Sequence, residues 1–218
     1  MTNPLAIARV DALLPITECL KPRKPKEFRE WVLAKCDAFS QMPELRKPVL
    51  LHEGPFKWFH EEIYPLSVFA IQRYGYRDDV LCIPKLDQTR DIDAEIREQS
   101  RPINIEITGA RCPGEHLLMK YLVEHRGVSL PGDLSTHLDW IKAAAERKSG
   151  WGRYGRSYEL LISVEDWWFD AGVNLPEVTS FIEREVLSLP LAFAAIHVVG
   201  LTERLLLSYP LPPSSRPL

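Results

Sequence analysis

Two short segments of strict alternation constrain the fold of this chain more than any other feature. Residues 91–96 (DIDAEI) and 103–108 (INIEIT) each alternate polar and apolar side chains. Because successive side chains of a strand point to opposite faces, this period predicts two strands, each with one polar face. The polar faces carry Asp91, Asp93 and Glu95 on the first segment and Asn104, Glu106 and Thr108 on the second.

If these strands are neighbours, side chains directly opposite each other lie ~5 Å apart. Carboxylates at that separation repel each other unless a cation lies between them. A hard cation such as Mg²⁺ prefers such oxygen ligands. A half-solvated surface is the competing interpretation, because any strand with one face in water shows the same alternation.

The rest of the chain predicts helices and strands around this pair. Residues 56–74 have apolar side chains at helical spacing, with Pro65 as a kink or break. In residues 135–148, a second helix is expected to have Ser135 as its N-cap. These elements predict an α/β fold with a central mixed sheet of about four to five strands flanked by helices. The remaining expected elements are helices at 115–125 and 176–187 and strands at 80–84, 158–164 and 193–199.

The order of these elements, with Asp93 followed by Glu106-Ile107-Thr108, resembles the PD-(D/E)xK superfamily of restriction-endonuclease-like nucleases. The resemblance implies that Asp93 and Glu106 hold Mg²⁺, or alternatively Mn²⁺. It also implies a glutamate from the first helix, either Glu61 or Glu62. Adjacent helical residues point about 100° apart, so only one can face the site. Glu62 is preferred because it flanks the apolar stripe of Phe59, Ile63 and Leu66.

Thr108 stands where the superfamily has a lysine. A hydroxyl can orient a water molecule but supplies no positive charge to the reacting phosphate. Lys148, at the end of the helix that starts at Ser135, is the candidate substitute, with His116 and Lys120 as alternatives. The resemblance therefore implies a catalytic set of Asp93, Glu106, Thr108 and Lys148.

A basic and aromatic segment follows the same helix and is the candidate nucleic-acid contact. Cations can pair with phosphates and aromatic rings can stack on bases, although a solvated loop has the same composition. The net charge of −3 argues against an extended basic binding face. The residues of this segment are Arg147, Lys148, Arg153, Tyr154 and Arg156.

The organisation expected is a helical extension over 1–55 that packs on the core, a restriction-endonuclease-like domain over 56–207 and a Pro/Ser-rich tail over 208–218 that is extended or disordered. No membrane span or signal peptide is expected, so the predicted location is cytoplasmic. No phosphate-binding glycine motif occurs, which argues against a nucleotide cofactor. The sequence thus predicts a Mg²⁺-dependent nuclease or nuclease-like nucleic-acid-binding protein. The alternative is a non-catalytic protein of the same fold that acts as a protein-interaction or scaffold module.

Overall fold

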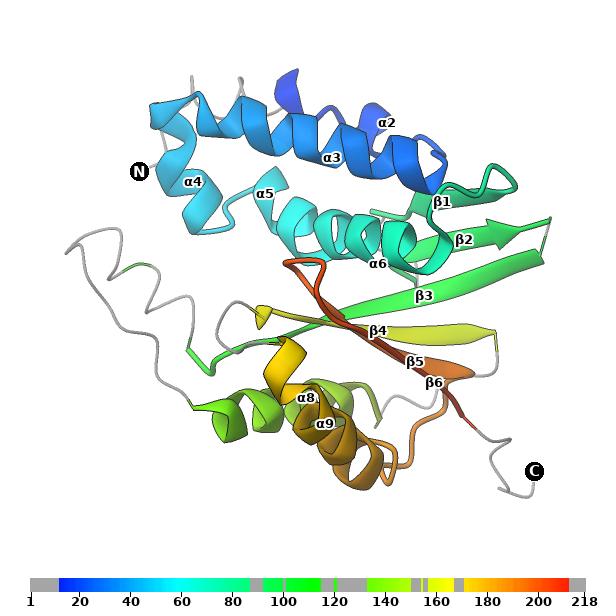
Figure 1. The fold of residues 1–218 in the computed structure, drawn as a ribbon. Coiled ribbons are helices and arrows are strands. Elements are labelled where there is room, and N and C mark those ends of the chain that lie inside the picture. Colours follow the sequence, from blue (N-terminus) through cyan, green and yellow to red (C-terminus); the bar gives the residue numbers. More distant parts are fainter. Residues whose placement is uncertain are drawn as a thin grey trace.

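The structure is a computed structural model of the 218-residue chain. It describes residues 12–86, 92–99, 101–114, 120, 133–149, 154, 157–166 and 171–211, with only the backbone described at 171–173. A central sheet separates two layers of helices (Figure 1). The layer that holds α3, α5 and α6 covers one face, and α8 and α9 cover the other.

The sheet is mixed and has six strands in the sequential order β1-β2-β3-β4-β5-β6. The pairs β3–β4 and β4–β5 are parallel, and the other three pairs are antiparallel. This arrangement confirms the α/β class and the mixed sheet. The strands are β1 (Val80–Pro84), β2 (Ala94–Glu98), β3 (Arg101–Ala110), β4 (Tyr158–Val164), β5 (Ala195–Gly200) and β6 (Leu206–Pro210).

The expected count of four to five strands was wrong because β6 was not predicted. Its last three residues fall in the stretch expected to be an extended or disordered tail. β6 is an edge strand, paired only with β5 within the described chain, and Pro210 is its final residue. Proline is tolerated at the edge of a sheet, because no further strand needs its missing N–H.

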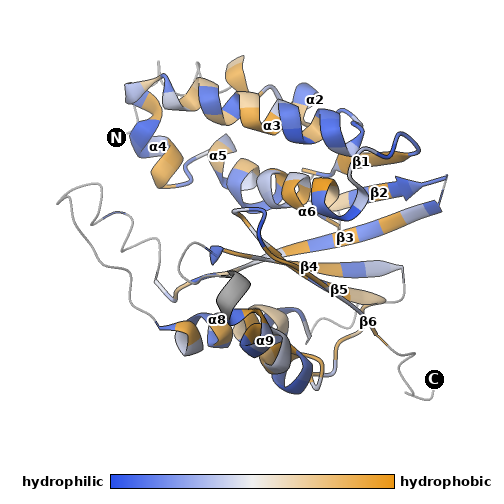
Figure 2. Cartoon of the chain, in the orientation of Figure 1, coloured by the Kyte–Doolittle hydropathy of each residue, from blue (hydrophilic) through white to orange (hydrophobic). Residues whose placement is uncertain are grey.

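Each face of the sheet packs against its own hydrophobic core. Successive side chains of a strand point to opposite faces of the sheet. In β4, Leu161 points to the α3/α6 side, whereas Leu160 and Ile162 point to the α8/α9 side. Figure 2 shows the apolar residues of β5 and β6 between layers whose helices carry both colours. Because Glu106 and Thr108 of β3 are in register with Leu160 and Ile162, their side chains lie on the α8 side.

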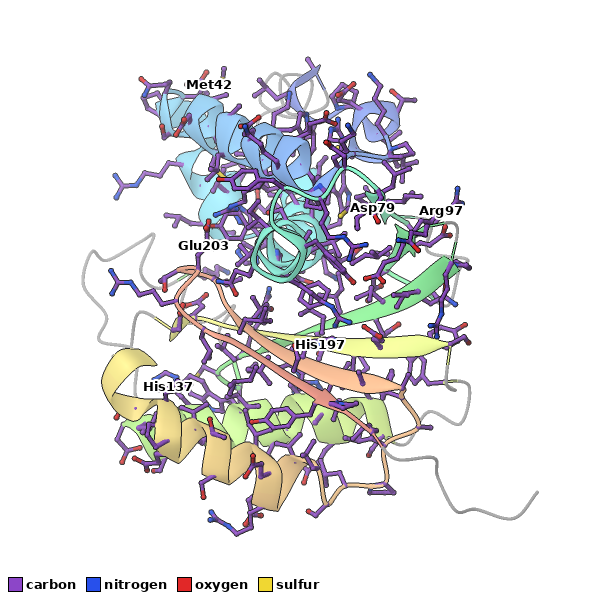
Figure 3. All side chains as sticks on the ribbon, turned by 45° about the vertical axis from the view of Figure 1, so that its right-hand side comes forward. Met42, Asp79, Arg97, His137, His197 and Glu203 are labelled. Atoms are coloured by element: carbon purple, nitrogen blue, oxygen red, sulfur yellow. The ribbon has the colours of Figure 1, made fainter. Side chains whose placement is uncertain are left out.

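The helices of the first layer are α2 (Ile16–Cys19), α3 (Pro25–Ser40), α4 (Arg46–Leu50), α5 (Pro55–Trp58) and α6 (Tyr64–Tyr74), with a 3₁₀ turn at Pro43–Leu45. Helix α3 buries Phe28 and Val32 in the core and is tied to the turn after β5. There, Arg29 Nε donates to Glu203 Oε1 at 2.7 Å. Glu203 is labelled in Figure 3, on the side of the sheet that α3 and α6 cover.

A π-helical segment, Phe59–Ile63, joins α5 to α6. The Tyr64 N–H bonds back to the Phe59 carbonyl, and Pro65 has no N–H with which to continue the regular α-helical ladder. The break predicted at Pro65 is therefore a change of helical pitch rather than an end of the helix. It places Glu61 and Glu62 in the irregular turn, and such π segments are frequent at functional sites.

The second layer consists of α8 (Leu134–Ser149), α9 (Ala171–Phe181) and a π segment at Ile182–Val186. The N-cap of α8 is Asp133, not Ser135 as expected, because Asp133 Oδ1 accepts the Thr136 N–H at 3.0 Å. Most of the helix expected at 115–125 lies outside the described residues. No helix in the described ranges is long and apolar enough to cross a bilayer.

Candidate active site

The candidate site lies where β3 continues beyond the end of β2. In the described chain, β2 pairs with β3 only as far as Ala94 opposite Ile105. Beyond that pair the regular ladder ends: the Asp93 N–H still donates to the Ile105 carbonyl at 3.2 Å, and Asp93 Oδ2 accepts the backbone N–H of Ile107 at 2.7 Å. The Asp93 carboxylate thus accepts the Ile107 N–H, which would bond to a backbone carbonyl if β2 were longer. This contact orients Asp93 toward the residues of β3 that follow.

Glu106 faces α8 and is almost completely buried, with 4% of its surface exposed. Its Oε1 forms an ion pair with Lys148 Nζ, from the last turn of α8. A lysine at this end of a helix is also favoured by the helix dipole. The structure therefore brings together two residues that are 42 positions apart in the sequence and that were both predicted to act at one site.

Thr108 lies two residues further along the same face of β3 and is also buried. Arg147, the neighbour of Lys148, reaches this point from α8. Its Nη2 donates to the carbonyl oxygen of Gly109 at 2.9 Å and lies 3.5 Å from Thr108 Oγ1. The end of α8 therefore supplies two cations to the polar face of β3.

Glu61 and Glu62 approach from the opposite helical layer, and both line the site. The expectation that only one of them could face it was therefore wrong, because both lie in the π-helical turn. Arg111 Nη1 donates to Glu61 Oε1 at 2.8 Å, and His52 Nδ1 lies 3.7 Å from the same oxygen. Although burial opposes the charged form, His52 and Arg111 lower the pKa of Glu61 below its ordinary value. Glu61 therefore has positively charged or hydrogen-bonding partners of its own.

Glu62 is in a different state. Within the described ranges its carboxyl forms neither a hydrogen bond nor an ion pair. Burial raises its pKa from 4.5 to about 8. Repulsion by the carboxylates of Asp93, Glu61 and Glu106 adds to this shift, against a smaller opposing effect of Lys57. A cation placed among these groups would remove the repulsion.

These side chains surround a cavity of about 350 Å³. Five of the predicted residues line it, and Glu106 lies behind its wall, bonded to Lys148. Sequence reasoning missed Lys57 and Arg111. Lys57 stands one helical turn before Glu61, a spacing that could have revealed it. The lining residues predicted in advance are Glu62, Asp93, Thr108, Arg147 and Lys148.

Two other predicted residues within the described ranges do not join this cavity. Tyr154 is buried at 6% exposure in the core beneath α8, and its ring stacks on Phe193 with a centroid separation of 4.7 Å. The prediction that Tyr154 contacts nucleic acid is therefore wrong, because its ring is enclosed by protein. Lys120 is exposed and is not among the residues that line the cavity. His116, Arg153 and Arg156 lie outside the described residues.

A second cavity, of about 470 Å³, adjoins the first across Gly109 and Arg111, which line both. It lies beyond the carboxyl ends of the parallel strands β3, β4 and β5, the position where open α/β sheets bind ligands. The rings of His52 and His60 stack on one of its sides with centroids 4.8 Å apart. Burial lowers the pKa of His60 to about 4, so this ring is uncharged at neutral pH.

The donor atoms at the site suit a hard divalent cation, because carboxylate oxygens predominate. Among the described residues, however, no group of three or more His, Cys, Asp or Glu side chains is arranged to hold a metal ion. Mg²⁺ commonly binds through one or two carboxylates and completes its shell with water and substrate phosphate. Asp93 lines the cavity and can supply one such carboxylate, and Glu106 behind the wall retains Oε2, because Lys148 bonds to Oε1. The repulsion at Glu62 also favours a cation here.

In comparisons with known proteins, the chain matched no family model, no curated protein and no solved structure. The functional argument therefore depends on the geometry and the chemistry of the residues themselves.

Proposed function

We propose that the protein is a Mg²⁺-dependent nuclease, or a nuclease-like nucleic-acid-binding protein, related to the PD-(D/E)xK superfamily. In this proposal Asp93 and Glu106 hold Mg²⁺ or Mn²⁺. Glu62 becomes a further ligand only if its side chain turns toward the ion, because the described arrangement does not group the three carboxylates. Lys148 replaces the lysine that the superfamily has at the position of Thr108.

The observation that carries the proposal is the ion pair between Lys148 and Glu106 at the wall of the first cavity. We call it the acidic cavity after Glu61, Glu62 and Asp93, although four basic side chains also line it. The two residues come from elements that meet only through folding, and the lysine lies on the helix where a substitute was expected. Asp93, held by the Ile107 N–H, lies at the same cavity. Three chemical functions, an acidic pair, a lysine and a hydroxyl, thus meet within one site.

A bound Mg²⁺ would supply Lewis-acid polarisation of a phosphate oxygen and would lower the pKa of an attacking water. The chain's own groups do the remaining work. Thr108 Oγ1 orients the attacking water by accepting or donating a hydrogen bond. Lys148 and Arg147 place positive charge where negative charge develops on the phosphate. Lys57, exposed at the opposite side of the cavity, attracts the nucleic-acid backbone.

One observation favours the alternative of a non-catalytic interaction or scaffold module. Asp93 and Glu106 both already have protein partners, the Ile107 N–H and Lys148. Carboxylates satisfied in this way can serve structure alone, because buried charges are normally paired. The nuclease proposal differs in requiring that these groups also bind a cation.

Isothermal titration with Mg²⁺ and with Mn²⁺ tests the proposal on the wild type and on an Asp93→Asn, Glu106→Gln double variant. We expect binding by the wild type and its loss in the double variant, which keeps the shape of both side chains. The matched control is Asp79→Asn, which changes one carboxylate in the exposed ion pair with Arg77, away from the cavity.

Incubation of the same proteins with single- and double-stranded DNA and RNA then measures cleavage. Cleavage by the wild type and by Asp79→Asn, but not by the double variant, would support the nuclease. Unchanged metal affinity in the double variant would remove Asp93 and Glu106 as ligands and refute the proposed site.

A further inference from the structure

The second cavity adjoins the acidic one at the end of β3. Gly109 and Arg111 line both cavities. The Arg111 side chain folds back over Gly109, so that a Cβ on Gly109 would lie 2.7 Å from Arg111 Nε. Because Gly109 has no side chain, the Arg111 guanidinium can lie between the two cavities. A ligand that fills one cavity would meet Arg111 and could continue into the other.

The walls of this second cavity differ in chemistry from those of the first. His52, His60 and Tyr64 present three rings, and Ala110 and Leu201 add apolar surface. Ser163, Glu165 and Thr202 add polar groups that can donate or accept hydrogen bonds. A few polar groups in an otherwise apolar pocket of about 300–1,000 Å³ are typical of sites for small organic groups.

We propose that the second cavity binds the base of a nucleotide that flanks the scissile phosphate, and that the substrate is therefore single-stranded or locally unpaired. This inference rests on the proposed function, which places the scissile phosphate in the acidic cavity. A base is planar, aromatic and edged with hydrogen-bonding groups, so it suits rings and a few polar side chains together. Arg111 lies between the two cavities, where the linking sugar and phosphate would pass.

The geometry favours a single strand over a duplex. A base inside a duplex is stacked and paired, and bringing it into a pocket costs a few kcal/mol for unstacking. A single strand avoids that cost. The basic groups at the acidic cavity, Lys57, Arg111, Arg147 and Lys148, are also few, and Arg111 and Lys148 have carboxylate partners. A duplex binder would need a broader basic surface.

His52 is the residue best suited to a test. Its backbone has φ of 50°, in the left-handed region, and its side chain is 26% exposed at the cavity. Asparagine tolerates this backbone conformation better than most residues, so His52→Asn removes the ring with little backbone strain. Gln99 has φ of 47° in the exposed β2–β3 turn, away from both cavities. Gln99→Asn is therefore the matched control.

A second variant approaches the cavity differently. Leu201→Trp would fill the space with an indole ring. It keeps the Leu201 carbonyl, which accepts the Tyr64 hydroxyl at 3.4 Å. This variant tests the cavity even if His52→Asn alters the neighbouring contact with Glu61.

The assay is fluorescence anisotropy with labelled short oligothymidylate and oligouridylate, and with a duplex of equal length. All proteins carry Asp93→Asn and Glu106→Gln and are measured in EDTA, so neither metal binding nor cleavage affects the result. We expect the single strands to bind at least about tenfold more tightly than the duplex. His52→Asn and Leu201→Trp should each weaken single-strand binding about tenfold, as expected for loss of one stacked base, whereas Gln99→Asn should not.

Equal affinity for duplex and single strand, or unchanged affinity in both cavity variants, would overturn the inference. Because the measurement needs neither metal nor cleavage, a failure of the nuclease proposal leaves its outcome readable. The metal titration of the unmodified acidic site decides that proposal separately.

Discussion

Replacement of Glu62 by glutamine should stabilise the protein, and the gain should grow with pH. Glu62 is half-buried among acidic groups, and its pKa lies at about 8 instead of 4.5. Below the lower value the carboxyl is neutral in both the folded and the unfolded chain. Between the two values it is neutral when folded but ionised when unfolded, so unfolding releases a proton and stability falls as pH rises.

The pKa values set the size of the effect. At about 1.36 kcal/mol per pH unit, the interval between 4.5 and about 8 gives an upper limit of roughly 5 kcal/mol. Part of this is lost because the carboxyl is not fully enclosed and can turn toward water. We therefore expect the Glu62→Gln variant to exceed the wild type by roughly 2–3 kcal/mol above pH 8, and to match it near pH 4.

Urea unfolding in EDTA at a series of pH values measures this difference directly. Glu27→Gln is a suitable control, because Glu27 is an exposed glutamate of α3 outside the acidic cavity. A stability difference between Glu62→Gln and wild type that does not change with pH would refute the reasoning. So would a loss of stability above pH 8, which would mean that the charged form of Glu62 has a stabilising partner.

Two further predictions concern the buried contacts around the site. Lys148→Met should destabilise the fold by about 3 kcal/mol, because it leaves the carboxylate of Glu106 buried and unpaired. Addition of Glu106→Gln to this variant should restore much of the lost stability, as measured by urea unfolding. If the stability is not restored, Lys148 and Glu106 do not form a buried ion pair. Gly200→Ala should cost about 3 kcal/mol, because a Cβ there would lie 2.1 Å from Asp166 Oδ2, and Asp166 holds Thr202 through two hydrogen bonds. Thermal unfolding of Gly200→Ala checks this, and a variant as stable as wild type would show that Asp166 moves freely.

Local patterns were sufficient to predict most of the sheet. The strands at 80–84 and 158–164 have the expected bounds, since uninterrupted apolar runs carry a strong signal. The segment expected at 91–96 enters the regular ladder later, at Ala94. Asp93 still donates its backbone N–H to the Ile105 carbonyl, but its side chain, not its backbone, accepts the Ile107 N–H. The alternation was real, but periodicity does not show where a ladder stops.

The site was predictable where one element carried its residues, and not where separate layers meet. Lys148 could be proposed because it ends a helix that follows the acidic strands. Arg111 could not, since its role depends on Glu61 from the opposite helical layer. Tyr154 misled because glycine and arginine surround it in the sequence, as in an exposed loop, whereas its ring packs against Phe193 in the core. Tertiary packing decides such positions.

Glu62 also separates the two candidate functions. An acid that destabilises the fold persists when it contributes to function, and local costs of this kind cluster at active sites. Glu62 lies in the π segment, and Asp93, which precedes β2, lines the same cavity. If the protein is a nuclease, Glu62→Gln should gain stability and lose metal affinity together. If it is a scaffold, the variant should gain stability while the wild type shows no metal affinity to lose. Measurement of both properties on one variant therefore distinguishes the two functions.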